Sequence, residues 1–356
     1  MGRHKPRKSP LWARILVAFG AVVFAASAGA VVYVKVMVDK VNNAVGQECL
    51  LADCGSAEKA AENPLKGPLN LIMIGSDMRD SWDAAQSDTI MILHVNESLT
   101  AATILSIPRD LRVHIPRCYG GGPCTDKINA SFTVGGKDMG ESVKGLEGAL
   151  TELTGLKFDG AAVVNFAGFE DVVDLLGGVE LCVPFDMTLL HPQGKQVEKG
   201  CKLYTDTELA LGIVRERYAY DTDNPNWDPK YGQGDYGRQR MQQHFIKQIL
   251  KRAKEQGYLT NPLKVGELIQ GIGDQITVSL GGYTAVDYAV ALKGIDSSKL
   301  TTVKVPSQPQ TIDGTSYVVS MPGEQETAAE ALYKALREDT LDDWIVAHPQ
   351  WLNKNI

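Results

Sequence analysis

Apolar residues between positions 69 and 107 form short runs that are typical of β-strands. The runs Leu69–Ile74, Thr89–Val95 and Thr103–Ile107 are too short for a typical helix, and turn-forming or charged residues bound each of them. Only residues 96–100 join the second run to the third, and the segment between the first and second shows no helical periodicity. Because short connections favour antiparallel neighbours, we predict that these runs form adjacent antiparallel strands of one sheet.

Later segments alternate between helical and strand-like patterns. The clearest helix is Ser142–Leu153, whose apolar positions recur at helical spacing ahead of Gly155. We predict further helices at Phe169–Leu176, from Thr205 toward Arg215, and at Arg238–Ala253, Val265–Ile272, Thr284–Leu292 and Gln325–Arg337, with strands at Ala161–Phe166 and Val179–Val183 and a hairpin around Asp313-Gly314. This mixture predicts an α/β fold in which helices cover both faces of a mixed central β-sheet.

Two segments lack a regular pattern. Met187–Leu203 contains prolines and glycines and is predicted to be an exposed loop. The polar, turn-rich segment between Tyr218 and Tyr236 is long for an irregular connection inside a compact domain, which is typical of a functional or a disordered loop. Its aromatic residues could stack on sugar rings or pack within the loop: Tyr218, Tyr220, Trp227 and Tyr231.

The N-terminal region has the pattern of a membrane anchor. Ile15–Val34 is an uncharged apolar run of the length that spans a bilayer, and basic residues in 1–14 place the N-terminus in the cytoplasm. The alternative is a cleaved signal peptide, because Ala25–Ala30 is rich in small residues. We predict a cytoplasmic tail at 1–14, a transmembrane helix at 15–34, a stalk or linker at 35–68 and an extracytoplasmic domain at 69–356 of a single-pass cell-membrane protein.

Charge and cysteine content narrow the functional classes. The net charge of −7 argues against a nucleic-acid-binding protein, which needs a basic face. All six cysteines follow the apolar run, and an even number in an oxidising compartment favours disulfides. Proximity suggests the pairs Cys49–Cys54, Cys118–Cys124 and Cys182–Cys201, although six cysteines allow about fifteen connectivities. A zinc site is the disfavoured alternative, since no Cys-x-x-Cys pair is present.

Charged side chains follow or precede the opening strands. If the strands are antiparallel, one edge of the sheet collects two kinds of group, carboxylates and guanidiniums: Asp77, Arg79, Asp88, Arg109 and Asp110. Carboxylate oxygens suit a divalent cation and arginine forks suit phosphate oxygens. The alternative is that these residues only form salt bridges with one another. The sequence contains no Gly-x-Ser-x-Gly, Walker or His-Glu-x-x-His motif, so anion chemistry is the remaining candidate.

Two arginines at the start of a predicted helix also suggest an anion-binding site. Arg238 and Arg240 fall in the first turn of the helix predicted from Arg238, with Asp235 as its cap, where the helix dipole disfavours cations. We interpret this placement as a shared anion site.

Several ordered motifs resemble those of the LytR–CpsA–Psr (LCP) family. They cover roughly residues 70–250 and include Gly75–Arg79, Ser87–Thr89, Ser106–Asp110, Lys127–Ala130, Asn165–Phe169, Leu175–Val179, Arg215–Arg217 and Asp235–Arg240. High alanine, glycine and valine usage together with the cysteines hints at an actinobacterial member.

The resemblance implies a membrane-anchored phosphotransferase. Such a protein would move a glycopolymer from a polyprenyl-pyrophosphate carrier to peptidoglycan through a phosphodiester bond. It implies Mg²⁺, or Mn²⁺ in its place, on Asp77 and Asp88, and catalytic roles for Asp88, Arg109 and Asp110, with Asp110 alternatively orienting Arg109. Pyrophosphate would be bound by Arg79, Arg109, Arg215, Arg217, Arg238, Gln239 and Arg240. The lipid would need an apolar tunnel, for which the helices Ser142–Leu153 and Phe169–Leu176 are candidates.

Two other functions stay open, and one motif departs from the family. A polyprenyl-pyrophosphate hydrolase would use the same pocket with water as acceptor, and a non-catalytic lipid-binding or regulatory protein would bind without turnover. The short N-terminal tail cannot fold a DNA-binding motif, which counts against direct regulation. Gln86 stands where many relatives carry an arginine, so one cation is missing there.

Overall fold

The computed structural model describes residues 46–53, 64–76, 86–258, 271 and 275–353. The predicted tail, membrane span and most of the stalk or linker therefore lie outside the described residues, as do Asp77, Arg79 and nearly all of Val265–Ile272. None of the helices among the described residues has both the length and the apolar character needed to cross a bilayer.

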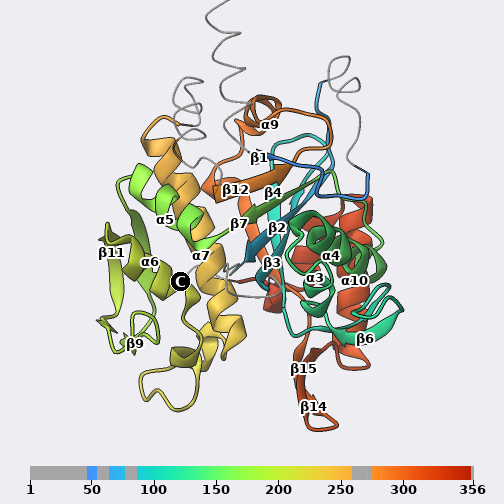
Figure 1. Cartoon of the computed structure of the whole chain (residues 1–356). Helices are drawn as coiled ribbons and strands as arrows, with labels where there is room; N and C mark the ends of the chain where they lie inside the picture. The colour runs from blue at the N-terminus through green and yellow to red at the C-terminus, as the bar shows by residue number, and fades with distance from the viewer. Residues whose placement is uncertain (1–45, 54–63, 77–85, 259–270, 272–274, 354–356) are drawn as a thin grey trace, which may run out of the picture.

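A seven-stranded mixed sheet forms the centre of the fold (Figure 1). The predicted opening strands are present as antiparallel neighbours, β2 (Leu69–Ser76), β3 (Ser87–Val95) and β4 (Ala102–Ile107). The strand order is β1-β12-β7-β2-β3-β4-β13, completed by β1 (Gly46–Gln47), β7 (Gly160–Val164), β12 (Ile276–Ser279) and β13 (Leu300–Lys304). Because β12 and β13 belong to this sheet, the C-terminal hundred residues complete the same core.

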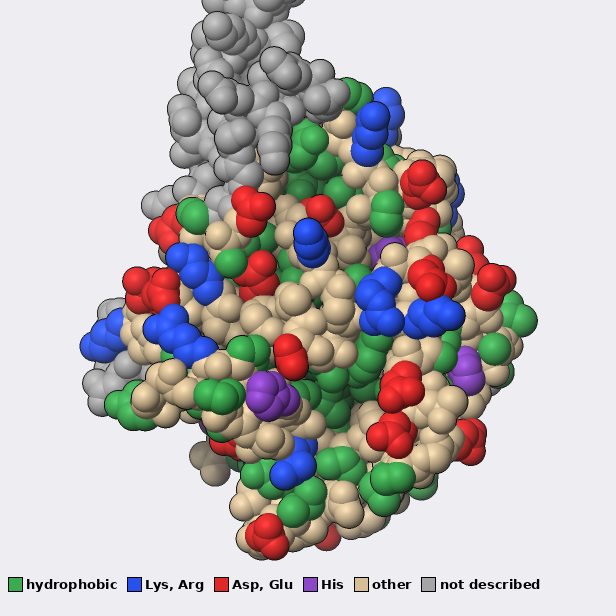
Figure 2. All heavy atoms as spheres, turned by 90° about the vertical axis from the view of Figure 1, so that its right-hand side faces the viewer, with side chains coloured by type: hydrophobic (Ala, Val, Ile, Leu, Met, Phe, Trp, Pro, Cys, Tyr) green, Lys and Arg blue, Asp and Glu red, His purple; other side chains and the backbone are tan. Residues whose placement is uncertain are grey.

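Helices cover both faces of the sheet, as predicted. On one face, side chains such as Ile72 and Ile92 pack against the helices α4 (Met139–Thr154), α10 (Glu324–Glu338) and α11 (Leu341–Ala347). On the other face, Met91 and Ile104 pack against α7 (Asp235–Glu255) and α9 (Ala285–Leu292). Figure 2 shows the side of the molecule that carries α4 and α10, where acidic and basic side chains are interspersed.

A second hydrophobic cluster lies beside α7. It is built by α5 (Phe166–Leu175), α6 (Thr207–Arg215), β8 (Val179–Val183), β9 (Met187–Thr188), β10 (Gln196–Val197) and β11 (Gly200–Tyr204). The prediction of a plain loop over 187–203 was therefore wrong: β9 pairs with β10, and β11 pairs with β8. Gly237 of α7 packs so closely against Tyr220 that a Cβ atom would lie 2.2 Å from the ring.

The remaining elements are short or peripheral. They comprise the hairpins of β5 (Arg112–Ile115) with β6 (Cys124–Lys127) and of β14 (Gln308–Ile312) with β15 (Thr315–Val319), the helix α3 (Ala130–Thr133), and 3₁₀ turns at Tyr218–Tyr220, Pro229–Tyr231, Ser297–Lys299 and Pro349–Trp351. The β14–β15 hairpin is the one predicted around Asp313-Gly314, and it projects from the lower edge in Figure 1.

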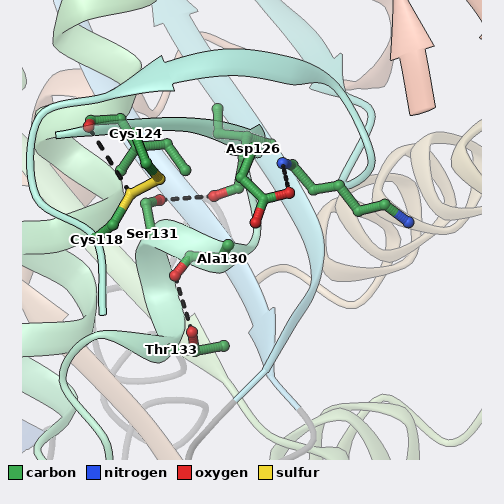
Figure 3. Close-up of a disulfide and its surroundings, with 9 residues drawn as sticks. Cys118, Cys124, Asp126, Ala130, Ser131 and Thr133 are labelled. Atoms are coloured by element: carbon green, nitrogen blue, oxygen red, sulfur yellow. Dashed lines mark hydrogen bonds between the residues drawn. A yellow bond between two sulfur atoms is a disulfide. The ribbon is translucent and has the colours of Figure 1, made fainter. Parts of the chain in front are cut away.

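Two of the predicted disulfides are present. Cys118–Cys124 closes the loop between β5 and β6, where Ser131 and Thr133 of α3 donate to nearby backbone carbonyls (Figure 3). Cys182–Cys201 joins β8 to β11 at directly paired positions. Cys49 is also disulfide-bonded, and its predicted partner Cys54 lies outside the described residues.

Candidate functional site

The antiparallel register of β3 and β4 brings Asp88 and Arg109 together. Ile90 faces Ile107 across the two strands, so the residues just outside this pair meet at one edge. There, the Arg109 guanidinium donates to the Asp88 carboxylate. Burial disfavours the charge on Arg109, but Asp88, Asp235 and Asp110 outweigh burial and raise the pKa of Arg109 above its usual value. The prediction that carboxylates and guanidiniums come together at this edge is confirmed for Asp88 and Arg109.

Asp110 lies between two cations. Its Oδ1 is 3.0 Å from Lys127 Nζ on β6, and its Oδ2 is 3.8 Å from Arg109 Nε. Its backbone oxygen accepts a hydrogen bond from Val318 of β15. This placement fits the second of the two predicted roles, in which Asp110 orients Arg109.

The start of α7 adds Arg238 to the same edge. Arg238 Nη2 donates to the Asp88 backbone oxygen at 2.9 Å and to the Asp235 carboxylate, whose Oδ2 accepts from Gln239 Nε2 at 2.8 Å. The helix begins three residues earlier than predicted, at Asp235, with Gly234 as its N-cap. Asp235 is therefore not the cap, and its carboxylate in the first turn offsets the dipole, so the placement of Arg238 does not by itself require an anion.

The other arginines that were predicted to bind pyrophosphate make different contacts. Arg215, the last residue of α6, lies with its Cζ 3.7 Å from the centre of the Phe166 ring. Arg217 instead covers the Tyr218 ring at 4.9 Å and donates to its hydroxyl. Arg240 donates to the Lys230 backbone oxygen at 2.6 Å, and burial lowers its pKa. The structure thus groups Asp88, Arg109, Arg238 and Gln239, while the contacts of Arg217 are with its own loop.

A cavity of about 250 Å³ opens beside this group. Its polar part contains the charged side chains of Asp88, Arg215 and Arg238, and Thr89, Asn165 and Gln242 add uncharged polar groups. The rest of the wall is mainly apolar and comes from the sheet, α5, α6 and α7, including Met73, Met91, Phe169, Leu211, Val214, Phe245 and Ile246. Of the two helices predicted to line an apolar tunnel, α5 therefore contributes, whereas α4 packs on the opposite face of the sheet.

Sequence reasoning missed two acidic residues near the site. Asp235 was interpreted only as a helix cap, although its spacing of three and four residues from Arg238 and Gln239 would place all of them on one helix face. Glu216 is only 3% exposed, and its carboxylate accepts hydrogen bonds from the backbone of Leu190, Arg217 and Ala219. Its position between two arginines in the sequence gave no sign of this structural role.

The oxygen donors in this group are of the type that Mg²⁺ prefers. Asp88 supplies a carboxylate. Ser87, which precedes Asp88, and Gln239, which follows Arg238, carry the buried oxygens Ser87 Oγ and Gln239 Oε1. Neither oxygen has a hydrogen-bond partner among the described residues. Within the same part of the chain, no three His, Cys, Asp or Glu side chains are grouped so that they could hold a metal. The second predicted ligand, Asp77, falls outside that part.

Gln86 lies directly before β3, where it is exposed. Its backbone oxygen accepts a hydrogen bond from Ser76 Oγ at 2.9 Å, which joins the ends of β2 and β3. Because glutamine is uncharged, the Gln86 side chain supplies no cation at this corner.

Comparisons with known proteins agree with the resemblance described above. The model of the LytR_cpsA_psr family matches residues 35–334. A probable cell wall biosynthesis protein, LcpB of Corynebacterium glutamicum, is 31% identical over 241 residues, which cover 63% of this chain and 52% of that protein. The chain thus spans about half the length of this relative. The polyisoprenyl-teichoic acid–peptidoglycan teichoic acid transferase TagT of Bacillus subtilis is 28% identical over 315 residues, covering 84% and 88% of the two chains.

Solved structures support the fold. The crystal structure of B. subtilis TagV superposes with a TM-score of 0.59 at 22% identity, covering 78% of this chain and 98% of TagV. A structure described as TagT bound to LIIa-WTA gives a TM-score of 0.55 at 22% identity, covering 76% and 90%. At these identities the likeness establishes the α/β fold alone.

Proposed function

The chain belongs to the LytR_cpsA_psr family, and on that premise we propose that it is a phosphotransferase that moves a glycopolymer from a polyprenyl-pyrophosphate carrier to peptidoglycan. The names of its relatives support this class of reaction, since TagT is named a polyisoprenyl-teichoic acid–peptidoglycan teichoic acid transferase. The observation that carries the proposal for this chain is a mainly apolar cavity that Arg215 and Arg238 also line, because a lipid pyrophosphate has both an apolar tail and an anionic head.

The two parts of the cavity match the two parts of such a donor. Arg215 and Arg238 would bind phosphate oxygens at the polar part, where planar guanidinium forks match phosphate geometry. The apolar wall from α5, α6 and α7 would contact the first isoprenoid units. Arg109 would act from the adjoining edge, held by Asp88 and Asp110.

Transfer would break the phosphoanhydride bond of the donor and form a phosphodiester bond to the acceptor. An acceptor hydroxyl attacks the phosphorus that carries the glycan, and the bond from that phosphorus to the bridging oxygen breaks. The electron pair leaves with polyprenyl phosphate, and the hydroxyl proton passes to a base or to water. Phosphoryl transfer depends mainly on positioning and charge neutralisation, which arginines and a cation supply without covalent participation of the protein.

Asp88 would hold a divalent cation together with Asp77. When bound, Mg²⁺ would neutralise part of the pyrophosphate charge. The pair with Arg109 seen in the structure would keep the Asp88 carboxylate oriented before the metal and the donor arrive.

The test compares products rather than binding alone. Full-length protein in detergent would receive a polyprenyl-pyrophosphate oligosaccharide and un-cross-linked peptidoglycan, with Mg²⁺ or EDTA. We expect both polyprenyl phosphate and glycan-bearing peptidoglycan to form with Mg²⁺. Arg109→Ala should lower the rate by about 100-fold, the typical effect of removing one transition-state donor.

Arg117→Ala is the matched control, because the Arg117 side chain is 58% exposed and pairs with Glu141 of α4. Its rate should equal that of the wild type. Release of polyprenyl phosphate without attached glycan would replace the proposal with a hydrolase, and donor binding without turnover would replace it with a lipid-binding protein.

A further inference from the structure

A second hollow lies on the surface next to the arginine site. Its volume is about 670 Å³, within the range of roughly 300 to 1,000 Å³ that ligand pockets occupy. One wall is the β9–β10 hairpin and the other is the segment from Tyr218 to Asn226. We call this hollow the hairpin groove.

The strand pattern of the hairpin gives the groove a polar wall. Met187 and Val197 pack into the second hydrophobic cluster, so the residues that alternate with them face outward. Thr188, Gln196 and Glu198 are accordingly exposed, and they line the groove together with the buried Met187 and Val197.

The opposite wall presents one exposed aromatic ring. Tyr218 is 60% exposed even though the Arg217 guanidinium lies over its ring, so stacking on a sugar would use the ring face away from Arg217. Tyr220 is 1% exposed, and the Trp227 indole donates to the Gly232 backbone oxygen. Trp227 and Tyr231 pack against the second cluster. Of the aromatic residues that the sequence suggested for stacking on sugars, Tyr218 is therefore the one placed to do so.

Hydrogen bonds hold the two walls in place without a ligand. The Glu216 carboxylate accepts from Leu190 beyond β9 and from Ala219 beside Tyr218, at 2.7 and 3.0 Å. Asn224 donates to the Ala219 backbone oxygen at 3.0 Å and accepts from the Asn226 backbone. The groove is thus formed in advance, which lowers the entropic cost of binding.

The chemistry of the groove differs from that of the arginine site. Its described lining residues include three carboxylates, Asp186, Glu198 and Asp223, while the Arg217 guanidinium lies against the lining residue Tyr218. Carboxylates disfavour a polyphosphate chain. Amide, hydroxyl and carboxylate groups can exchange hydrogen bonds with sugar hydroxyls, and an exposed tyrosine ring can pack against the C–H face of a sugar.

The groove adjoins the candidate catalytic site. Arg215 lines the cavity and Tyr218 lines the groove, and three residues of extended chain span at most about 11 Å. A glycan in the groove would therefore reach the arginines within a few sugar units.

We propose that the hairpin groove binds an uncharged N-acetylhexosamine glycan, the acceptor strand on which the transferred polymer is placed. The assignment of this glycan as the acceptor rests on the proposed function, whereas glycan binding itself does not. The anionic donor would occupy the arginine cavity while the neutral acceptor lies along Tyr218.

Binding would be measured first. Full-length protein in a detergent without sugar groups would be titrated calorimetrically with the N-acetylglucosamine tetramer, with and without saturating inorganic pyrophosphate. We expect binding that pyrophosphate does not abolish. Tyr218→Ala should weaken it by about three- to tenfold, the loss that one aromatic contact supplies, while Tyr218→Phe should retain it.

Tyr119→Ala is the control, since Tyr119 is 92% exposed on the loop of the Cys118–Cys124 disulfide. It should bind like the wild type. Equal affinity of wild type and Tyr218→Ala, or loss of binding when pyrophosphate is added, would overturn the proposal.

The transfer assay then separates acceptor from donor sugars. We expect Tyr218→Ala to raise the KM for peptidoglycan severalfold while leaving the KM for the lipid donor and the kcat unchanged. A raised donor KM instead would show that the groove holds the donor's sugars and would overturn the acceptor assignment. If no transfer occurs in the wild type, the proposed function fails, but the calorimetric result still decides whether the groove binds a glycan.

Discussion

Asp88 and Arg109 show what single residues contribute before any substrate binds. Their pairing uses one carboxylate oxygen of Asp88, and the Asp88 backbone oxygen is used by Arg238. One residue thus connects two guanidiniums from distant segments. Because the opening strands are antiparallel with short links, the sequence predicted that Asp88 and Arg109 would meet.

Side-chain direction outside the strands was harder to predict. Arg215 and Arg217 are two residues apart, yet the first lines the cavity and the second covers Tyr218. The helix α6 ends between them, and the extended backbone at Glu216 turns the following side chain away. No periodic pattern in the sequence marks this change of backbone direction.

Because His244 is buried as a neutral ring, we expect the free energy of unfolding to depend on pH. It is 7% exposed, and its Nε2 accepts a hydrogen bond from the Cys182 backbone, which requires the neutral ring. Burial, helped by Lys247, lowers the pKa of His244 from 6.5 to about 4. Between these values the unfolded chain binds a proton that the folded chain does not, so the free energy of unfolding falls as the pH drops from about 6.5 to 4, by up to about 3 kcal/mol.

Thermal unfolding of the wild type and of His244→Gln between pH 4 and 7.5 would check this pH dependence. The glutamine keeps an acceptor but does not titrate, so its melting temperature should vary less over that range. His114→Gln is the control, because the His114 side chain is 53% exposed. An unchanged slope in His244→Gln would show that other groups cause the pH dependence.

At the scale of elements, α7 contributes Arg238 to the candidate site and packs against the sheet. Its apolar residues were predicted, and the helix is observed over Asp235–Glu255. The early start was not predicted, because Gly234 supplies the N-cap without a capping side chain. The short strands β9 and β10 were missed for a similar reason, since two residues are too few to show an alternating pattern.

Gln243 attaches α7 to the sheet through a buried polar network. Its Nε2 donates to Ser106 Oγ at 2.7 Å and to the Val303 oxygen at 3.0 Å, and its Oε1 accepts from Asn353 at 2.7 Å. Gln243→Leu would leave these partners unsatisfied, so we expect the free energy of unfolding to fall by about 2 to 3 kcal/mol. Chemical denaturation would measure this loss.

Gln310→Leu is the matched control, since Gln310 is exposed on β14. It should change stability by less than about 0.5 kcal/mol. A similar effect of both substitutions would contradict an anchoring role for Gln243.

At the scale of the whole molecule, two hydrophobic regions enclose the candidate site. The sheet with its helices forms one, and the cluster around β8 and α6 forms the other. The α/β class was predictable from the alternation of helical and strand-like patterns. The separate second cluster was not, because it depends on a pairing between β8 and β11 that the intervening loop-like sequence conceals.

The Cys182–Cys201 disulfide should stabilise this second cluster. It closes a loop with a sequence separation of 19, compared with 6 for Cys118–Cys124. We expect replacement of Cys182 and Cys201 by serine to lower the free energy of unfolding by about 3 kcal/mol, and replacement of Cys118 and Cys124 to cost less because the loop is shorter.

Hydrogen exchange would locate the effect of each replacement. Protection in β8 and β11 should fall in the Cys182/Cys201 variant, while β2, β3 and β4 stay protected. The serine variant of Cys118 and Cys124 is the control. Equal losses of protection in both variants would contradict a local role for Cys182–Cys201.

The hydrogen bond from Arg238 to Asp88 joins residues that are 150 positions apart in the chain. During synthesis the opening strands emerge long before α7, so a nascent chain that stops ahead of Asp235 contains Asp88 and Arg109 but lacks the helix that completes the cavity wall. The cavity can therefore be completed only after most of the polypeptide has been made. A prematurely terminated product would carry Asp88 and Arg109 without the residues of α7 that line the cavity.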